Sequence, residues 1–279
     1  MILVADSGST KTDWKFMGKD NSFLFQTSGI NPFYMSDEQI FTEIKEEVLP
    51  NINLLLTKIY FYGAGIVGDQ KTRMESILSK AFVGTQAYAE SDLLGAARAL
   101  CGDEEGIACI MGTGANSCLY DGVKIIDNIP PLGFIQGDEG SGAVLGKQLI
   151  TMYLKRELSD KLAKQFNEQY HLDTADILRK VYQEAFPNRF LAEFSKFIYE
   201  HIEDEQMYHL VYDSFNEFLE RNVYKYTNYQ KINIHFVGSV AFYFKGILQS
   251  IFKENNLKMG KIIKSPLNDL VKYHLKHLS

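Results

Sequence analysis

The stretch MILVADSGSTKTDWKF, residues 1–16, introduces the structural plan that the chain later repeats. Four apolar residues, 2–5, predict a buried strand that leads directly into an acidic residue and a Ser/Gly/Thr turn. From Thr12 to Phe16 the apolar and polar residues alternate, which predicts a second strand. The sequence therefore predicts a strand, a tight polar turn and a second strand.

The predicted turn has the composition of a phosphate-binding loop. Gly8 allows the backbone to approach a ligand closely, and Ser9, Thr10 and Lys11 offer hydroxyl, amide and ammonium donors. Asp6, at the end of the first strand, is placed to meet a hydrated cation such as Mg²⁺. An ordinary polar hairpin would show the same pattern, so this stretch alone leaves both interpretations open.

Residues 107–122 repeat the plan, with an apolar strand, a turn made of Gly112, Thr113 and Gly114, and a second strand. Two similar phosphate-sized turns, about a domain apart, indicate two related halves that face one nucleotide. Residues 234–241 predict a third element, in which a strand ends at Gly238-Ser239 before a helix.

Composition limits the class of protein. The 279 residues suffice for two domains, and 46% hydrophobic with 23% charged residues is typical of a globular protein. A net charge of −6 without a basic patch argues against nucleic acid, and no apolar run is long enough for a membrane span. The three cysteines form no Cys-x-x-Cys pair and are expected to be reduced core residues of a cytoplasmic protein.

The order of predicted elements is that of an α/β protein. The first hundred residues read β-β-β-α-β-α-β-α, and residues 158–222 carry helical patterns without a strand signal. The remaining expected elements are strands at 23–26, 58–62, 86–89, 231–237 and 261–263, and helices at 36–48, 70–82, 92–100, 141–155, 241–253 and 267–278.

Two glycine motifs compete with this interpretation. A Walker-type P-loop is excluded, because Thr10 stands where that motif requires glycine and a strand follows in place of a helix. Residues 63–68 form a literal G-x-G-x-x-G after a predicted strand, with Glu90 about 20 residues further on, as in dinucleotide-binding proteins. A dinucleotide site at this motif would leave both polar turns without a role. We therefore favour a glycine-rich turn that forms the bottom of a cleft at the carboxyl ends of the strands.

Two acidic positions are candidates for chemistry on a hydroxyl group. Asp92 follows a predicted strand and begins a helix, so it is either a plain helix N-terminal residue or the acceptor of a hydroxyl proton in phosphoryl transfer. Asp138 and Glu139 are too close together for a hydrolytic carboxylate pair, which favours hydroxyl binding. The six histidines show no metal-binding spacing.

Four motifs in this order resemble those of the sugar kinase/actin-like ATPase superfamily, and within it the N-acetylglucosamine kinase-like branch of the BadF/BadG/BcrA/BcrD ATPase family. They span residues 1 to about 250. The motifs are DSGSTKT at 6–12, MGTGANS at 111–117, GDEGSG at 137–142 and VGSVA at 237–241.

The resemblance implies an α/β fold of two ribonuclease-H-like (actin-like ATPase) domains with ATP in the cleft between them. The expected divisions are residues 1–103, residues 104–265 with a helical insertion, and a C-terminal helix at 266–279 that packs on the first domain. It further implies phosphorylation of an amino sugar, N-acetylglucosamine in the first instance, at its primary 6-hydroxyl with ATP and Mg²⁺. The small-molecule partners are then the sugar and ATP, and the oligomeric state is left open, with a homodimer as one option.

The same resemblance assigns roles to single residues. Asp92 would be the catalytic base, Asn31 and Asp138 would bind the sugar, and Mg²⁺ would lie near Asp6, held through water. The residues implied to contact ATP are Gly8, Ser9, Thr10, Lys11, Gly112, Thr113, Gly114, Gly238, Ser239 and Ala241.

Departures from the family pattern leave the substrate open. The family commonly has Trp-Gly ahead of Gly-Asp-Glu-Gly, whereas residues 131–134 here are Pro-Leu-Gly-Phe, and these positions, Gly133 among them, line the sugar pocket of relatives. N-acetylmuramic acid and glucosamine are therefore further candidate substrates. Two different functions also stay open: an activator ATPase that serves an iron–sulfur enzyme, and a sugar sensor with a degenerate site.

Overall fold

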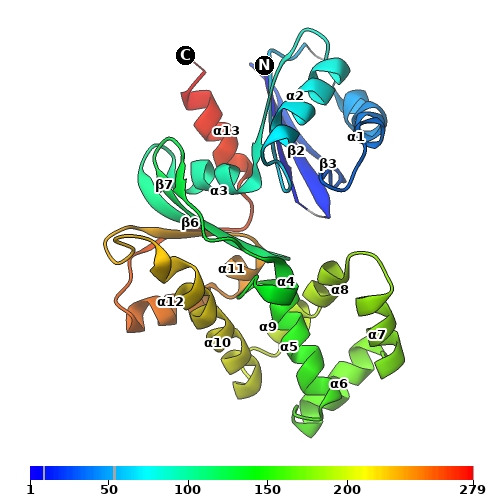
Figure 1. Ribbon diagram of the computed structural model, residues 1–279, viewed down its shortest axis with the longest axis vertical. Helices are drawn as coiled ribbons and strands as arrows, with labels where there is room; N and C mark the ends of the chain where they lie inside the picture. The colour runs from blue at the N-terminus through cyan, green and yellow to red at the C-terminus, as the bar shows by residue number, and fades with distance from the viewer. Residues whose placement is uncertain (9, 53–54, 279) are drawn as a thin grey trace. The chain divides into compact units, whose positions relative to one another are not determined.

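The computed structural model describes residues 1–8, 10–52 and 55–278, which form two compact units (Figure 1). Unit 1 comprises Met1–Glu104, Asp121–Ile125 and the chain from Ser265 onward. Unit 2 comprises Glu105–Tyr120 and Ile126–Lys264. Each unit has its own five-stranded sheet and its own hydrophobic core, so each is described separately.

The sheet of unit 1 has the strand order β3-β2-β1-β4-β5. Its strands are β1 (Ile2–Ser7), β2 (Lys11–Met17), β3 (Ser22–Ser28), β4 (Lys58–Gly63) and β5 (Gln86–Ser91). The first three are antiparallel neighbours, whereas β1, β4 and β5 run parallel. Ser7, Gly63 and Ser91 are in register across the three parallel strands, so the segments that follow β1, β4 and β5 all leave from one edge of the sheet.

The helices of unit 1 pack around this sheet. They are α1 (Asp37–Glu43), α2 (Asp69–Ala81), α3 (Asp92–Cys101) and α13 (Leu267–Lys276). The predicted capping box is confirmed, because the Ser36 hydroxyl accepts from the Gln39 backbone N–H and the Gln39 side chain accepts from Ser36 N–H. The predicted helix at 36–48 differs in its second half. After α1 the chain winds into a π turn, η1 (Ile44–Val48), which buries Ile44 and Val48, and then into the 3-10 turn η2 (Leu49–Asn51).

The last helix, α13, belongs to unit 1. His274 is buried and stacks on Tyr60 with 3.5 Å between ring centroids, and the hydroxyl of Tyr62 lies 2.9 Å from its Nε2. Lys276 and His277 both form ion pairs with Asp103, at the end of the first segment. Through these contacts, the two ends of the chain form one folded unit.

The sheet of unit 2 has the order β10-β9-β6-β7-β8. Its strands are β6 (Glu105–Met111), β7 (Ala115–Asp121), β8 (Ile125–Asp127), β9 (Ile234–Val237) and β10 (Met259–Ile263). Strand β9 pairs in parallel with both β6 and β10. Strand β9 is buried throughout and β6 is buried from Gly106 to Cys109, which explains why both sequences are mainly apolar.

Unit 2 is otherwise helical, and the absence of a strand between residues 158 and 222 is confirmed. Its helices are α4 (Gly133–Gln136), α5 (Gly142–Leu154), α6 (Asp160–Tyr170), α7 (Thr174–Tyr182), α8 (Pro187–Glu193), α9 (Ser195–Glu200), α10 (Glu205–Arg221), the 3-10 turn η3 (Val223–Lys225), α11 (Ser239–Tyr243) and α12 (Lys245–Glu254). The predicted helix at 241–253 is broken at Phe244, between α11 and α12. Within the described parts of the chain, no helix is both long and apolar enough to cross a membrane.

Candidate functional site

The turn between β1 and β2 separates exposed donors from buried anchors. Gly8 N–H donates to the Lys11 carbonyl at 3.0 Å, and Gly8, Thr10 and Lys11 are all exposed. The flanking hydroxyls of Ser7 and Thr12 are buried, 2.7 Å apart, and turned away toward a neighbouring loop. The turn therefore presents Thr10 and the Lys11 ammonium to solvent, whereas the Gly8 N–H is already bonded within the turn. The predicted contact Ser9 lies outside the described residues.

Asp6 stands in an environment that disfavours its charged form. Burial, together with the negative charges of Asp92 and Asp13, raises its pKa to about 7, and only Lys11 opposes this shift. Lys11 is in turn shared with Asp13, to which its ammonium is paired at 3.0 Å. A divalent cation near Asp6 would relieve this repulsion, so the residues present fit a Mg²⁺ site.

Asp92 is the first residue of α3, directly after β5. The side chain of the N-cap residue Ser91 accepts from Leu94 N–H, and Asp92 Oδ1 accepts from Leu93 N–H at 2.9 Å. Burial raises the pKa of Asp92, and the hydrogen bond from Leu93 counteracts this. The structure thus brings Asp6 and Asp92, two acids predicted from separate motifs, into electrostatic contact at one sheet edge.

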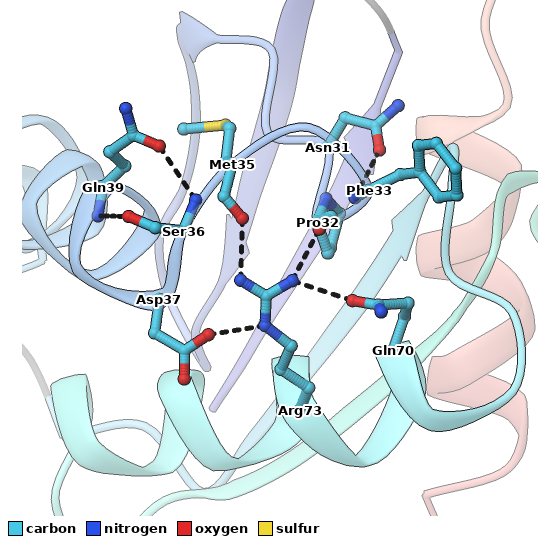
Figure 2. Close-up of polar contacts among 9 residues, drawn as sticks. All are labelled: Asn31, Pro32, Phe33, Met35, Ser36, Asp37, Gln39, Gln70 and Arg73. Atoms are coloured by element: carbon cyan, nitrogen blue, oxygen red, sulfur yellow. Dashed lines mark hydrogen bonds and ion pairs between the residues drawn. The ribbon is translucent and has the colours of Figure 1, made fainter.

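Asn31 lies in the loop between β3 and α1, and its amide orientation is fixed by the backbone (Figure 2). Phe33 N–H points at Asn31 Oδ1 at 2.9 Å, and a backbone N–H can only donate. Asn31 Oδ1 therefore already accepts one hydrogen bond, and Nδ2 is the donor that Asn31 can offer to a ligand.

The G-x-G-x-x-G motif supports this loop. Gly65 has a φ of 80°, and a Cβ placed on it would overlap Asn31 Oδ1 and come within 3.2 Å of the Phe33 Cβ. Glycine is required here both for its backbone conformation and for close contact. The motif, which imitates a dinucleotide fingerprint, thus allows the turn after β4 to pack against Asn31.

In unit 2 the turn of residues 112–114 joins β6 to β7 and is bound to the start of α5. Gly142 N–H donates to the Gly112 carbonyl at 2.8 Å, and Ala143 N–H donates to the Thr113 carbonyl at 3.1 Å. Thr113 is partly exposed, so its hydroxyl can reach a ligand. The first N–H groups of α5 are thus used to hold the glycine-rich turn in place.

The adjacent acids Asp138 and Glu139 have different interaction partners. Asp138 Oδ1 accepts from Ala115 N–H at 3.3 Å, beside the Gly114 turn, and burial raises its pKa to about 6. Glu139 is buried and pairs with Arg221 of α10 at 3.5 Å. Asp138 alone is therefore a candidate for ligand binding, and the two acids do not act as a hydrolytic carboxylate pair.

Gly133, which was also predicted to contact the sugar, begins the short helix α4. Leu132 and Gly133 both have positive φ angles, 61° and 71°. Asp138 N–H donates to the Pro131 carbonyl at 2.9 Å, so the backbone of this segment is bonded directly to Asp138. The departure from the family pattern therefore lies on an exposed loop bonded to Asp138.

The end of β9 adjoins the turn of residues 112–114. Gly238 has a φ of 126°, and a Cβ there would overlap the Met111 carbonyl, so only glycine permits this approach. Ser239 then begins α11 and lines a cavity of about 420 Å³. The rest of the lining comes from α9, α11 and the residue after α11: Ser195, Lys196, Tyr199, Glu200, Val240, Tyr243 and Phe244. The predicted contact Ala241 is fully buried in the core.

Sequence reasoning missed the two tyrosines of this cavity. Tyr199 and Tyr243 lie with ring centroids 5.2 Å apart and are 44% and 45% exposed. Aromatic residues at helical spacing predicted core packing, and no sequence signal separates these two from their buried neighbours. Their pairing depends on contact between helices about forty residues apart.

No family model and no curated protein matches the chain. A candidate N-acetylglucosamine kinase from Porphyromonas gingivalis has 46% sequence identity, with 100% of both chains covered and a TM-score of 0.96. A second candidate, from Chromobacterium violaceum, has 15% identity over 98% of both chains and a TM-score of 0.75. A ROK family glucokinase from Streptomyces griseus, solved with glucose and AMPPNP, has 11% identity over 97% of this chain and 98% of its own, with a TM-score of 0.55.

The two sheets and these likenesses define the class: an α/β protein with the two-domain fold of actin-like ATPases and sugar kinases. The expected fold class is confirmed. Within that class, 46% identity over the whole length shows the family, and the chain belongs to that of the Porphyromonas gingivalis candidate N-acetylglucosamine kinase. This confirms the expectation of a sugar kinase, whereas no match confirms the BadF/BadG/BcrA/BcrD name.

Proposed function

We propose that this protein transfers the γ-phosphoryl group of ATP to the 6-hydroxyl of N-acetylglucosamine, in the manner of the N-acetylglucosamine kinase-like branch of BadF/BadG/BcrA/BcrD ATPases. The observation that carries the proposal is the edge of the unit 1 sheet where Asp6 and Asp92 interact electrostatically. Phosphoryl transfer to an alcohol requires a cation close to the group that accepts the hydroxyl proton, and the proposal gives these roles to Asp6 and Asp92. The full-length relative from Porphyromonas gingivalis supports the choice of sugar.

The proposal assigns separate parts of ATP to separate groups of residues. Phosphate is assigned to the exposed turn of unit 1, where Gly8 allows close approach of the backbone and Thr10 and Lys11 supply donors. It is also assigned to the turn at residues 112–114 in unit 2. The cavity beside Ser239 is assigned to the adenine base, because two tyrosine rings supply flat apolar surface.

Asp92 is assigned the role of general base. It orients the sugar hydroxyl and takes up its proton as the sugar oxygen bonds to the γ-phosphorus, and ADP leaves as the bond to the bridging oxygen breaks. Mg²⁺ bound to ATP supplies charge neutralisation of the phosphates, and Asp6 would hold it through water. In this scheme Asn31 donates from Nδ2 to a sugar oxygen, and Asp138, with Gly133 on the same segment, receives sugar hydroxyls.

A sugar screen tests the proposal. Purified protein with ATP and Mg²⁺ is assayed for ADP release with N-acetylglucosamine, glucosamine, N-acetylmuramic acid and glucose. We expect the highest kcat/KM for N-acetylglucosamine, with the 6-phosphate as product by NMR. Preference for a different amino sugar would redirect the substrate assignment. ADP release that needs no sugar, together with bound iron, would favour the activator ATPase. ATP binding without turnover on any sugar would favour a sensor.

A further inference from the structure

The loop that carries Asn31, residues 29–36, has no regular secondary structure. Its entry is anchored at Ile30, which is fully buried and whose N–H and carbonyl both bind the Ser7 hydroxyl. The tip is different, because Phe33 and Tyr34 are 68% and 73% exposed. Burial of these aromatic side chains therefore does not hold the tip in place.

Arg73 of α2 binds this tip from below (Figure 2). Its Nη1 donates to the Pro32 carbonyl at 2.5 Å, and its Nη2 donates to the Met35 carbonyl at 2.7 Å. The Nε group donates to Asp37 at 2.5 Å, and Nη1 also donates to Gln70 at 2.8 Å. One guanidinium thus satisfies backbone carbonyls on both sides of the tip, in a loop that supplies no sheet or helix partner for them.

The contacts of Asn31 itself depend on the same turn. Tyr34 and Met35 both donate their N–H groups to the Asn31 carbonyl, at 3.1 and 3.2 Å, and Phe33 N–H fixes the side chain. Arg73 holds Pro32, which directly follows Asn31, and Met35, which closes the turn. The position of the Asn31 amide is therefore coupled to the position of one distant side chain.

We propose that Arg73 is a positioning residue for substrate: it does not touch the sugar but holds the residue 31–35 turn in the form in which Asn31 Nδ2 faces the ligand. This inference rests on the proposed function, which makes Asn31 a sugar contact. The planar fork of arginine is needed, because the two carbonyls bind separate Nη groups, whereas a lysine ammonium has all three of its donors on one nitrogen. The ion pair with Asp37 is secondary, since Asp37 is 66% exposed.

The kinetic test separates sugar binding from ATP binding. For Arg73→Ala we expect the sugar KM to rise about tenfold or more, since a loss of alignment can cost up to about a hundredfold. The ATP KM should change less than twofold. Arg73→Lys should recover only part of the sugar KM, and Asp37→Asn should be close to wild type. Lys80→Ala, an exposed residue on the same helix, is the matched control. An Arg73→Ala enzyme with unchanged sugar KM, or with equal rises in both KM values, would refute the inference.

A second measurement does not depend on activity. Hydrogen exchange in the ligand-free protein should be faster in Arg73→Ala at the amides of Phe33, Tyr34 and Met35, while the core strands β1 and β4 stay protected. Unchanged exchange at these amides would overturn the positioning role even if the enzyme were active. Failure of the wild-type protein to phosphorylate any sugar, with faster exchange in the variant, would instead disprove the proposed function and keep Arg73 as the group that orders the turn.

Discussion

Asp92 raises the pKa of Asp6, although the two acids lie 86 positions apart in the chain. Asp6 is on β1 and Asp92 directly follows β5, and β4 lies between these two strands. The register explains the proximity. Asp6 pairs with Tyr62, Tyr62 pairs with Glu90, and Asp92 follows two residues later at the start of α3. A carboxylate beside a second negative charge binds a proton or a cation more readily than an isolated one. The raised pKa of Asp6 gives the first prediction.

Asp6 should make the ligand-free protein less stable as the pH rises. Its pKa in the folded protein is raised from 3.8 to about 7, so the folded state binds this proton more tightly than the unfolded state does. The stabilising contribution is complete below pH 3.8 and is lost as the pH rises to about 7. Asp6→Asn should therefore be more stable than wild type at pH 8, with a flatter dependence between these limits, while losing Mg²⁺-dependent activity.

Urea unfolding at a series of pH values measures this effect. Asp20→Asn, at an exposed acid on the turn between β2 and β3, is the control and should follow the wild-type curve. If Asp6→Asn and wild type showed parallel curves from pH 4 to pH 8, the raised pKa of Asp6 would be wrong.

The second prediction concerns Asp92. Asp92→Asn keeps the shape of the side chain and can still accept from Leu93 N–H, so the start of α3 should be preserved. Loss of a positioned general base should lower kcat roughly 10²–10⁴-fold. ATP affinity by calorimetry should remain near wild type, with Asp20→Asn again as control. Turnover by Asp92→Asn at near the wild-type rate would remove Asp92 from the mechanism.

The sequence predicts those candidate site residues that stand in a recognisable local pattern. The polar turn at residues 8–11 was predicted because a strand, a turn and alternation are short-range signals. Asp92 was predicted because a strand end and a helix start meet there. The sequence does not predict the role of Arg73, because an arginine on an amphipathic helix is expected to face solvent. Nothing in the local pattern indicates its hydrogen bonds to the carbonyls of residues 32 and 35.

Packing also decided what local patterns could not. The period of apolar residues predicted one helix at 36–48, but burial of Ile44 and Val48 is reached through a π turn, which has no distinct sequence pattern. Likewise, the structural reason for glycine in the G-x-G-x-x-G motif at 63–68 is the close contact between Gly65 and Asn31, which the sequence does not show. Such contacts join segments more than thirty residues apart.

The third prediction uses a matched pair of glycines. Gly65 and Gly68 both have positive φ angles, 80° and 55°, but a Cβ on Gly68 would meet nothing within 4 Å, whereas one on Gly65 would overlap Asn31. Alanine at either site should cost about 1–3 kcal/mol of backbone strain. Only Gly65→Ala should also displace Asn31 and raise the sugar KM, by about tenfold or more. Equal sugar KM values in the two variants would show that the Gly65 contact has no effect on the sugar site.

The last prediction concerns the cavity beside Ser239. Tyr243 is 45% exposed, and its hydroxyl accepts a hydrogen bond from Lys264 at 2.7 Å. If the ring stacks on adenine, Tyr243→Ala should weaken ADP binding about 5- to 100-fold, because stacking of a base on an aromatic side chain contributes about 1–3 kcal/mol. Tyr243→Phe keeps the ring and loses only the bond to Lys264, so it should bind ADP nearly as wild type.

Calorimetric titration with ADP measures the affinities. Tyr182→Ala, at a 79% exposed tyrosine of α7 that does not line this cavity, controls for the loss of a surface ring. Loss of ADP affinity in Tyr243→Ala but in neither Tyr243→Phe nor Tyr182→Ala would assign the ring to the base. Equal affinity in all three variants would show that the base does not stack on Tyr243. The phosphate assignments of Thr113 and Lys11 would then need their own test by substitution.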